Sequence, residues 1–303
     1  MKNFILKIIL LAVIPVPLFL LMGLRQEKDE VITFKRKLFE QYRGSTQCLI
    51  TGTSHTLTGI NPTLFPIKAF SVADDSKPVE VDIEIIEKNI NLLPNLKYVI
   101  IPVDYFTLYF TGLHEKSAAK YYHHWGLKDG YIKSYFYLKR FHAFTCGFLL
   151  NEHNCDDQYD TLMGYRPQFA DLSKTSDSFR LRACQLKINY WNDLWIDTSN
   201  VQTIYTRLEG FIFMLQKRNI QTILVTMPVC KTLYSRFDPV LLKRNNQLID
   251  NLTHSTHAKY VNLQNNNLLA ADSLYKDIDH LNDKGATIAT KIISDFITSE
   301  KEP

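Results

Sequence analysis

At positions 49–56 the chain has the sequence Leu49-Ile50-Thr51-Gly52-Thr53-Ser54-His55-Thr56. The short apolar run at 47–50 is typical of a strand, and it passes directly into a glycine, hydroxyl residues and a histidine. Open α/β sheets bind their ligands just outside the carboxyl ends of their strands. This stretch therefore predicts a functional site that follows the first strand of a sheet.

Strand and helix patterns alternate along the rest of the chain. Further strands are predicted at 68–73, 97–103, 222–227 and 259–263, and helices at 79–93, 201–216, 240–252 and 287–297. The run 97–103 is almost continuously apolar, as expected for a parallel strand that is buried on both faces. Because helices separate the strands, we expect an α/β domain with one parallel sheet of about five strands, covered by helices on both faces.

The chain opens with an apolar segment. Residues 8–24 carry no charge, and about 17 such residues are the minimum for a transmembrane helix. No small-residue cleavage site follows this segment, which argues against a secretory signal peptide. We interpret 1–24 as an uncleaved membrane anchor. Its short basic start indicates an N-terminus inside the cell and a domain outside.

Two segments flank or interrupt the predicted sheet. Residues 25–46 have an amphipathic pattern, interpreted as a stalk helix that packs on the domain at 47–303; a helix on the membrane surface is the alternative. The insertion at about 105–197 is too long for an ordinary connection, so it must carry structure of its own. It is rich in aromatic residues, which favours a helical subdomain with an aromatic core. A cap that stacks on sugar rings, or a surface that lies on the bilayer, is the other interpretation.

The composition limits partners and cofactors. The net charge is only +4 and the basic residues are scattered, so a nucleic-acid partner is not expected. Gly52 stands alone, without the glycine-rich loop that binds phosphates. The histidines at 123–124, 254 and 257 have no carboxylate or cysteine at ligand spacing, so we expect no metal and no cofactor.

The five cysteines form no C-x-x-C pair. Cys146 and Cys155 are close enough in sequence to form a disulfide, which an extracytoplasmic location would permit. The sequence leaves that pairing open. Cys48 and Cys230 lie in or beside strand-like runs and are expected to be buried free thiols.

Near the other end of the chain stands Asp277-Ile278-Asp279-His280-Leu281-Asn282. A serine hydroxyl is a weak nucleophile until a base takes its proton, and the base needs a third group to orient it. On a turn that enters a helix, Asp277 and His280 would point to one side. We therefore predict a triad of Ser54, His280 and Asp277, in which Asp279 competes with Asp277 as the orienting carboxylate.

A serine after the first strand, with D-x-x-H before the last helix, resembles the SGNH/GDSL hydrolase superfamily. The blocks Gly52-Thr53-Ser54-His55 and Asp277 to Asn282 are similar to its membrane-anchored cell-envelope branch, which includes D-alanyl transfer proteins and alginate O-acetyltransferase-like proteins. The resemblance implies a flavodoxin-like three-layer α/β/α fold, with Ser54 as nucleophile, His280 as base and Asp277 as its orienting group. An α/β-hydrolase is disfavoured because the G-x-S-x-G elbow lacks its second glycine.

The chain departs from that family in the groups that stabilise the oxyanion. The family's second glycine and its asparagine block are not evident; the matching strand ends carry Ala73-Asp74-Asp75-Ser76 and Pro102-Val103-Asp104-Tyr105. Acidic side chains there would oppose a developing negative charge. The substrate or oxyanion candidates are Gly52, Ser76, His55 and Asn282, together with the backbone N–H of Ser54.

Several of these candidates have a structural alternative. Thr53 and Ser54 are suited to cap a following helix, and Asn282 is most simply a helix N-cap. His55 has three interpretations, which are packing under the sheet, contact with substrate and competition as the base.

These expectations lead to two functional hypotheses. The first is a membrane-anchored, extracytoplasmic serine esterase or O-acyltransferase that acts on a cell-envelope polysaccharide or another acylated glycan, with a membrane-embedded acyl donor as partner of a transferase. The alternative is a catalytically degenerate anchored module that binds glycan or scaffolds an assembly. A phosphate- or nucleotide-binding protein is a weaker third hypothesis, because no glycine-rich loop supports it.

Overall fold

The computed structural model describes residues 30–111, 121, 124–127 and 162–299. The predicted membrane anchor at 1–24 and the cysteine pair Cys146 and Cys155 lie outside these residues. Within the described part, no helix is both long and apolar enough to cross a membrane. The chain divides into two compact units, one formed by 1–36 and 114–156, the other by 37–113 and 157–303.

The described part of the first unit is small. It contains the start of helix α3 (Glu30–Tyr42), which lies within the predicted amphipathic segment. The Thr33 hydroxyl lies 3.4 Å from His124 Nδ1, and the Arg36 guanidinium lies over the Trp125 ring, 5.0 Å from its centroid. These contacts connect α3 to residues of the long connection after the third strand.

The second unit is built on one parallel sheet, as the sequence predicts. Its strands are β1 (Cys48–Ile50), β2 (Ala69–Ser71), β3 (Tyr98–Pro102), β4 (Gln221–Thr226) and β5 (Lys259–Asn262). They lie in the order β2-β1-β3-β4-β5, and Leu49 of β1 pairs with Phe70 of β2 and Val99 of β3. The order reverses between β1 and β3, the position at which sheets of this kind bind ligands.

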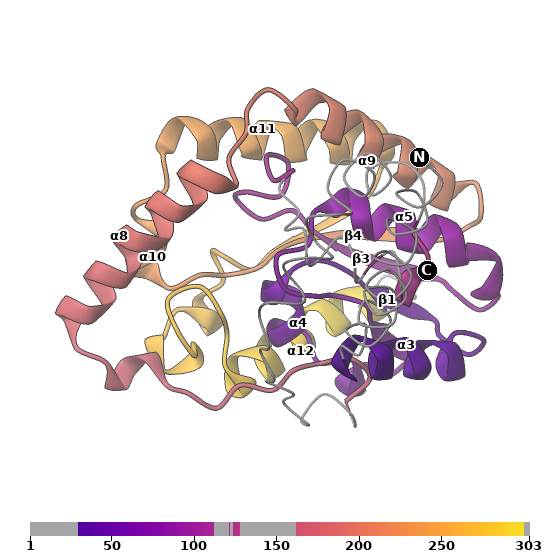
Figure 1. Ribbon diagram of the computed structural model, residues 1–303, viewed down its shortest axis with the longest axis horizontal. Helices are drawn as coiled ribbons and strands as arrows, with labels where there is room; N and C mark the ends of the chain where they lie inside the picture. The colour runs from indigo at the N-terminus through magenta and orange to yellow at the C-terminus, as the bar shows by residue number, and fades with distance from the viewer. Residues whose placement is uncertain (1–29, 112–120, 122–123, 128–161, 300–303) are drawn as a thin grey trace, which may run out of the picture. The chain divides into compact units, whose positions relative to one another are not determined.

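Helices cover both faces of this sheet (Figure 1). One layer contains α5 (Val79–Asn89), α9 (Val201–Gln216) and α11 (Pro239–Thr256), in which α9 packs against the other two. The other layer contains α4 (Ser54–Gly59) packed against α12 (Asp283–Ser299). The result is the three-layer α/β arrangement expected for a parallel sheet, in which β1, β2 and β3 are buried along their whole length.

The long connection between β3 and α9 is helical and aromatic in its described part. Its main element, α8 (Asp177–Leu194), begins where the Ser176 hydroxyl accepts the N–H of Phe179. The Phe106 ring lies 5.1 Å from the ring of Trp191 on α8, and both side chains are buried. The described aromatic residues of this segment therefore include core residues, as the favoured interpretation expects. The remainder of the segment lies outside the described residues.

Gly52 allows the chain to turn sharply out of β1. Its φ is +111°, a backbone conformation that residues with a side chain rarely adopt. A Cβ placed there would also clash with Cγ of Pro102. Only glycine fits between β1 and the end of β3. Gly52 thus sets the direction in which Thr53 and Ser54 leave the sheet.

Candidate active site

Ser54 is the first residue of α4, at the carboxyl end of β1. Thr53 is the N-cap of this helix, and its hydroxyl accepts the backbone N–H of His55 at 3.3 Å. Thr53 thus takes the capping role, which leaves the half-buried Ser54 side chain available for other contacts. Within the described part of the chain, no hydrogen bond uses the N–H of Ser54, as expected for the first turn of a helix.

The loop from Tyr275 to Asn282 presents the second half of the site. A bridge between Tyr275 and Leu281 closes the loop at its base, and the Lys276 N–H donates to the carbonyl of His280 at 2.9 Å. At its tip, the carbonyl of Ile278 accepts an N–H from Cys230 at 3.0 Å. The loop is therefore held at its base and at its tip, just before α12 begins.

Asn282 fixes the loop from within. Its Oδ1 accepts the N–H of Gly285 at 3.2 Å, which makes it the N-cap of α12. Its NH₂ group lies within hydrogen-bond distance of the carbonyls of Ala170, Ser273 and Tyr275. Since both amide hydrogens are engaged, these contacts argue against Asn282 as an oxyanion donor.

The structure brings Ser54, His280 and Asp277 together. His280 Nε2 lies 2.8 Å from Ser54 Oγ. On the other side of the imidazole, Nδ1 lies 2.9 Å and 3.1 Å from the two carboxylate oxygens of Asp277. This is the arrangement of a serine, a base and its orienting carboxylate.

Asp277 is the better placed of the two candidate orienting carboxylates. Its Oδ1 also accepts the backbone N–H groups of Asp279 and His280, at 3.1 Å and 2.9 Å, so the loop itself holds the carboxylate in place. Asp279 Oδ1 lies at 3.3 Å from His280 Nδ1. The imidazole therefore faces two carboxylates, of which Asp277 is the closer.

A second, buried chain of charged groups runs beside the triad. His55 Nδ1 lies 3.0 Å from Asp104 Oδ2, and the other Asp104 oxygen accepts the N–H of Met227 at 2.8 Å. His55 Nε2 lies 3.7 Å from Asp279 Oδ2, which in turn lies 2.8 Å from the ammonium of Lys187 on α8. Both His55 nitrogens face carboxylates, so His55 is neither the base at Ser54 nor a donor to an oxyanion.

The charges of this network alter the pKa values of its members. Burial lowers the pKa of His280, but the carboxylates of Asp279 and Asp277 outweigh it and raise the pKa to about 9. Burial likewise opposes the charged form of His55, whose pKa is nevertheless raised by its contacts with Asp104 and Asp279. His55 pairs with the Asp104 carboxylate, the acidic group that the sequence suggests would oppose an oxyanion.

The other sequence candidates lie away from these contacts. Asp75 forms an ion pair with Arg166 on the protein surface, with one N–O distance of 2.9 Å. Ser76 lies in the turn after β2 with a φ of 49°. No hydrogen bond joins Ser76 to Ser54 or His280 in the described ranges. Within those residues, the backbone N–H of Ser54 is the group best placed to stabilise an oxyanion.

Three side-chain atoms that could bind a metal ion lie close together. His55, Asp279 and His280 each offer one such atom, all within 4.8 Å of one another. These side chains are already engaged by Ser54, Asp104 and the Lys187 ammonium. Lys187 supplies a positive charge to Asp279, so the group has a stable arrangement as hydrogen-bonded side chains.

No protein-family model matches the chain, and no curated protein matches it in sequence.

The contacts of His280 predict how reactivity at Ser54 depends on pH. The imidazole accepts the serine proton only when it is neutral, and with a pKa of about 9 it is mostly protonated at neutral pH. The rate at which a fluorophosphonate labels Ser54 should therefore rise with pH and level off above about 9. Asp279→Asn removes one carboxylate, which lowers the pKa of His280 and moves the midpoint of this profile to lower pH.

Asp295→Asn, at an exposed position on α12, is the matched control and should leave the profile in place. A midpoint that is the same in the Asp279→Asn variant and in the unmodified protein would contradict the role assigned to Asp279.

Proposed function

We propose that the chain is a serine esterase or O-acyltransferase in which Ser54 is the nucleophile, His280 the general base and Asp277 the group that orients it. The observation that carries this proposal is the 2.8 Å contact between Ser54 Oγ and His280 Nε2, with Asp277 on the opposite nitrogen. Side chains from opposite ends of the sequence meet here at the carboxyl edge of a parallel sheet.

The reaction follows from these positions. Ser54 Oγ attacks the carbonyl carbon of an ester while His280 Nε2 takes the hydroxyl proton. When the tetrahedral intermediate collapses, the ester C–O bond breaks and His280 returns the proton to the leaving alcohol. Water or a sugar hydroxyl, whose proton His280 accepts, then attacks the acyl carbon. The bond between that carbon and Ser54 Oγ breaks, and His280 returns the proton to Ser54. Asp277 stabilises the imidazolium in both steps.

The order of the elements supports a relationship to the SGNH/GDSL superfamily. Ser54 follows β1, the loop with Asp277 and His280 precedes the last helix, and the strand order β2-β1-β3-β4-β5 is that of flavodoxin-like sheets. The family's asparagine block has no counterpart after β3, where Asp104 instead pairs with His55. We propose a member of this superfamily with a modified oxyanion site.

The cellular setting is proposed from the sequence. The uncharged run at 8–24 favours a single-pass membrane protein with its catalytic domain outside the cytoplasm. In that location the available substrates include acylated cell-envelope polysaccharides, and a membrane-embedded acyl donor would serve a transferase.

A fusion of alkaline phosphatase after residue 46 tests this orientation, because the phosphatase is active only outside the cytoplasm. The fusion should be active. An inactive fusion of a well-produced protein would contradict the orientation.

The catalytic role of Ser54 is tested by labelling with a fluorophosphonate. The unmodified protein should be labelled on Ser54, and Ser54→Ala should lose the label completely. His280→Ala should reduce the labelling rate by about a hundredfold or more, because the hydroxyl then keeps its proton. Ser76→Ala, a second serine at a strand end, is the matched control and should be labelled normally.

The same experiment separates the enzyme from the alternative hypothesis. A degenerate module that binds glycan or scaffolds an assembly would not be labelled at Ser54. Labelling that persists in Ser54→Ala, or that is absent from a folded unmodified protein at high pH, would contradict the proposed function.

A further inference from the structure

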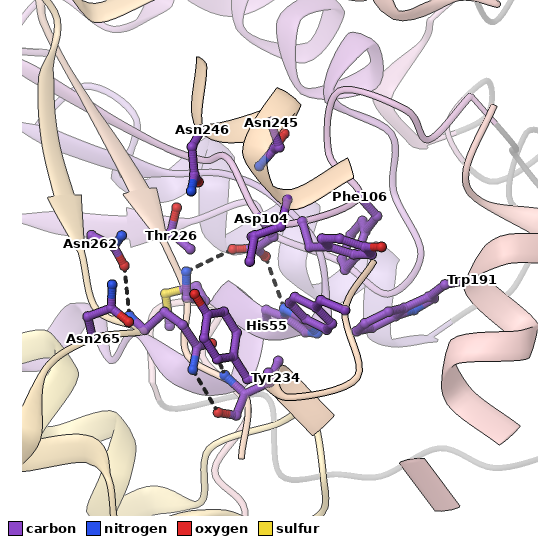
Figure 2. A pocket seen from close by; sticks show the side chains of 16 residues that line it. His55, Asp104, Phe106, Trp191, Thr226, Tyr234, Asn245, Asn246, Asn262 and Asn265 are labelled. Carbon is purple, nitrogen blue, oxygen red and sulfur yellow. Dashed lines mark hydrogen bonds and ion pairs between the residues drawn. The ribbon is translucent and has the colours of Figure 1, made fainter. Parts of the chain in front are cut away.

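A small cavity lies next to the triad at the carboxyl ends of β3, β4 and β5 (Figure 2). His55 and Asp104 line it, whereas Ser54 and His280 do not. The His55 ring also stands edge-on to the His280 ring, with 5.3 Å between their centroids. His55 therefore contacts both the cavity and the triad, although the cavity is a separate space.

Two kinds of side chain line this cavity. The aromatic ones include Tyr105 and Phe237, whose rings stack with centroids 4.0 Å apart. The others include side-chain amides: Asn245 and Asn246 from α11, Asn262 at the end of β5 and Asn265 just after it. Figure 2 places these two amide pairs on adjacent sides of the cavity.

Asn245 is the unusual member of this group. Its side chain is buried, with 2% of its surface exposed, and its Oδ1 has no hydrogen-bond partner among the described residues. A buried polar atom without a partner costs stability, so such atoms are normally satisfied by protein, water or ligand. Asn246, Asn262 and Asn265 are exposed, so the same chemistry extends to the mouth of the cavity.

The lining selects a neutral, hydroxyl-bearing ligand. No lysine or arginine lines the cavity, and its one carboxylate, Asp104, is paired with His55, so neither an anion nor a cation finds a partner. A side-chain amide both donates and accepts, and a hydroxyl group can satisfy it in both directions. A lining that combines aromatic rings and amides suits the apolar C–H groups and the polar rim of a sugar ring.

We propose that this cavity is a carbohydrate subsite. The cavity has a volume of about 40 Å³, which suits one hydroxymethyl or hydroxyl substituent of a sugar. That substituent bonds to Asn245, while the ring lies at the mouth among Asn246, Asn262 and Asn265. Sugar binding in this cavity does not depend on the proposed catalytic function. The further role, in which the cavity holds the acceptor or the acylated glycan beside Ser54, rests on the proposed function.

The test measures binding without catalysis. Saturation-transfer NMR is recorded on the full chain with Ser54→Ala, using methyl β-D-glucopyranoside as the probe and its fully O-methylated derivative as the matched compound without hydroxyl donors. The glucoside should receive saturation and the derivative should not. Asn245→Leu should reduce the transfer about threefold or more, because the cavity loses its buried hydrogen-bonding group.

Two further variants keep the test decisive if Asn245→Leu fails to fold. Asn246→Ala and Asn262→Ala change exposed residues and should also weaken the transfer, whereas Asn251→Ala, exposed elsewhere on α11, should not. No transfer to the glucoside, equal transfer to its methylated derivative, or transfer that survives the substitutions at 245, 246 and 262 would overturn the proposal. Binding of the peptide analogue N-acetylalanine methylamide in place of the sugar would also overturn it.

Failure of the subsite and failure of the proposed function give different results. Fluorophosphonate labelling of the unmodified protein reports on Ser54 and needs no sugar, so it tests the proposed function separately from the subsite. Sugar binding by a protein that is never labelled would support the subsite and contradict the esterase or transferase.

Discussion

The candidate site depends on one hydrogen bond between distant parts of the chain, which joins Ser54 Oγ and His280 Nε2. Two local constraints make it possible. Gly52 turns the chain sharply out of β1 against Pro102, so that Ser54 is the first residue of α4 while Thr53 caps the helix. The bridge from Tyr275 to Leu281 and the Asn282 cap hold the histidine loop at the start of α12. Because α4 and α12 pack against each other, the two halves meet.

The electrostatics beside this bond define what kind of site it is. Asp277 and Asp279 contact His280, and Asp104 contacts the neighbouring His55. Asp104 and Asp279 are buried, and two buried negative charges would be costly without partners. His55 and Lys187 offset that cost by pairing with Asp104 and Asp279. The carboxylates of Asp279 and Asp277 still raise the pKa of His280 to about 9. Such a base is well suited to hold a proton taken from serine, at the expense of being protonated at neutral pH.

Much of the fold and part of the site follow from local sequence patterns. The apolar runs and helical periodicities locate all five strands and four of the helices that cover them, because burial on one or both faces leaves a periodic trace. Ser54, Asp277 and His280 are identifiable because each lies at the edge of such an element. Thr53 and Ser54 are both suited to cap the helix that follows, and α4 is too short for a periodic pattern to choose between them; the structure assigns the cap to Thr53.

The remaining site residues have no local pattern that identifies them. Lys187 lies in α8, a helix with few buried residues inside the long connection, and its contact with Asp279 depends on how that helix packs on the domain. Asp104 follows β3 and is visible as an acidic residue at a strand end. That its charge is matched by His55 depends on the neighbouring placement of β1 and β3 in the sheet. Asn245 is one polar residue among several on α11. That its Oδ1 is buried without a hydrogen-bond partner among the described residues depends on how the surrounding elements pack, which the sequence does not show.

The central claim is that Ser54 forms a covalent acyl intermediate with His280 as its base. Mass spectrometry of the protein quenched during reaction with p-nitrophenyl acetate tests this most directly. We expect one added acetyl group on the peptide that contains Ser54, and no added acetyl group in the His280→Ala variant. An acetyl group on another residue, or the same yield on Ser54 without His280, would contradict it.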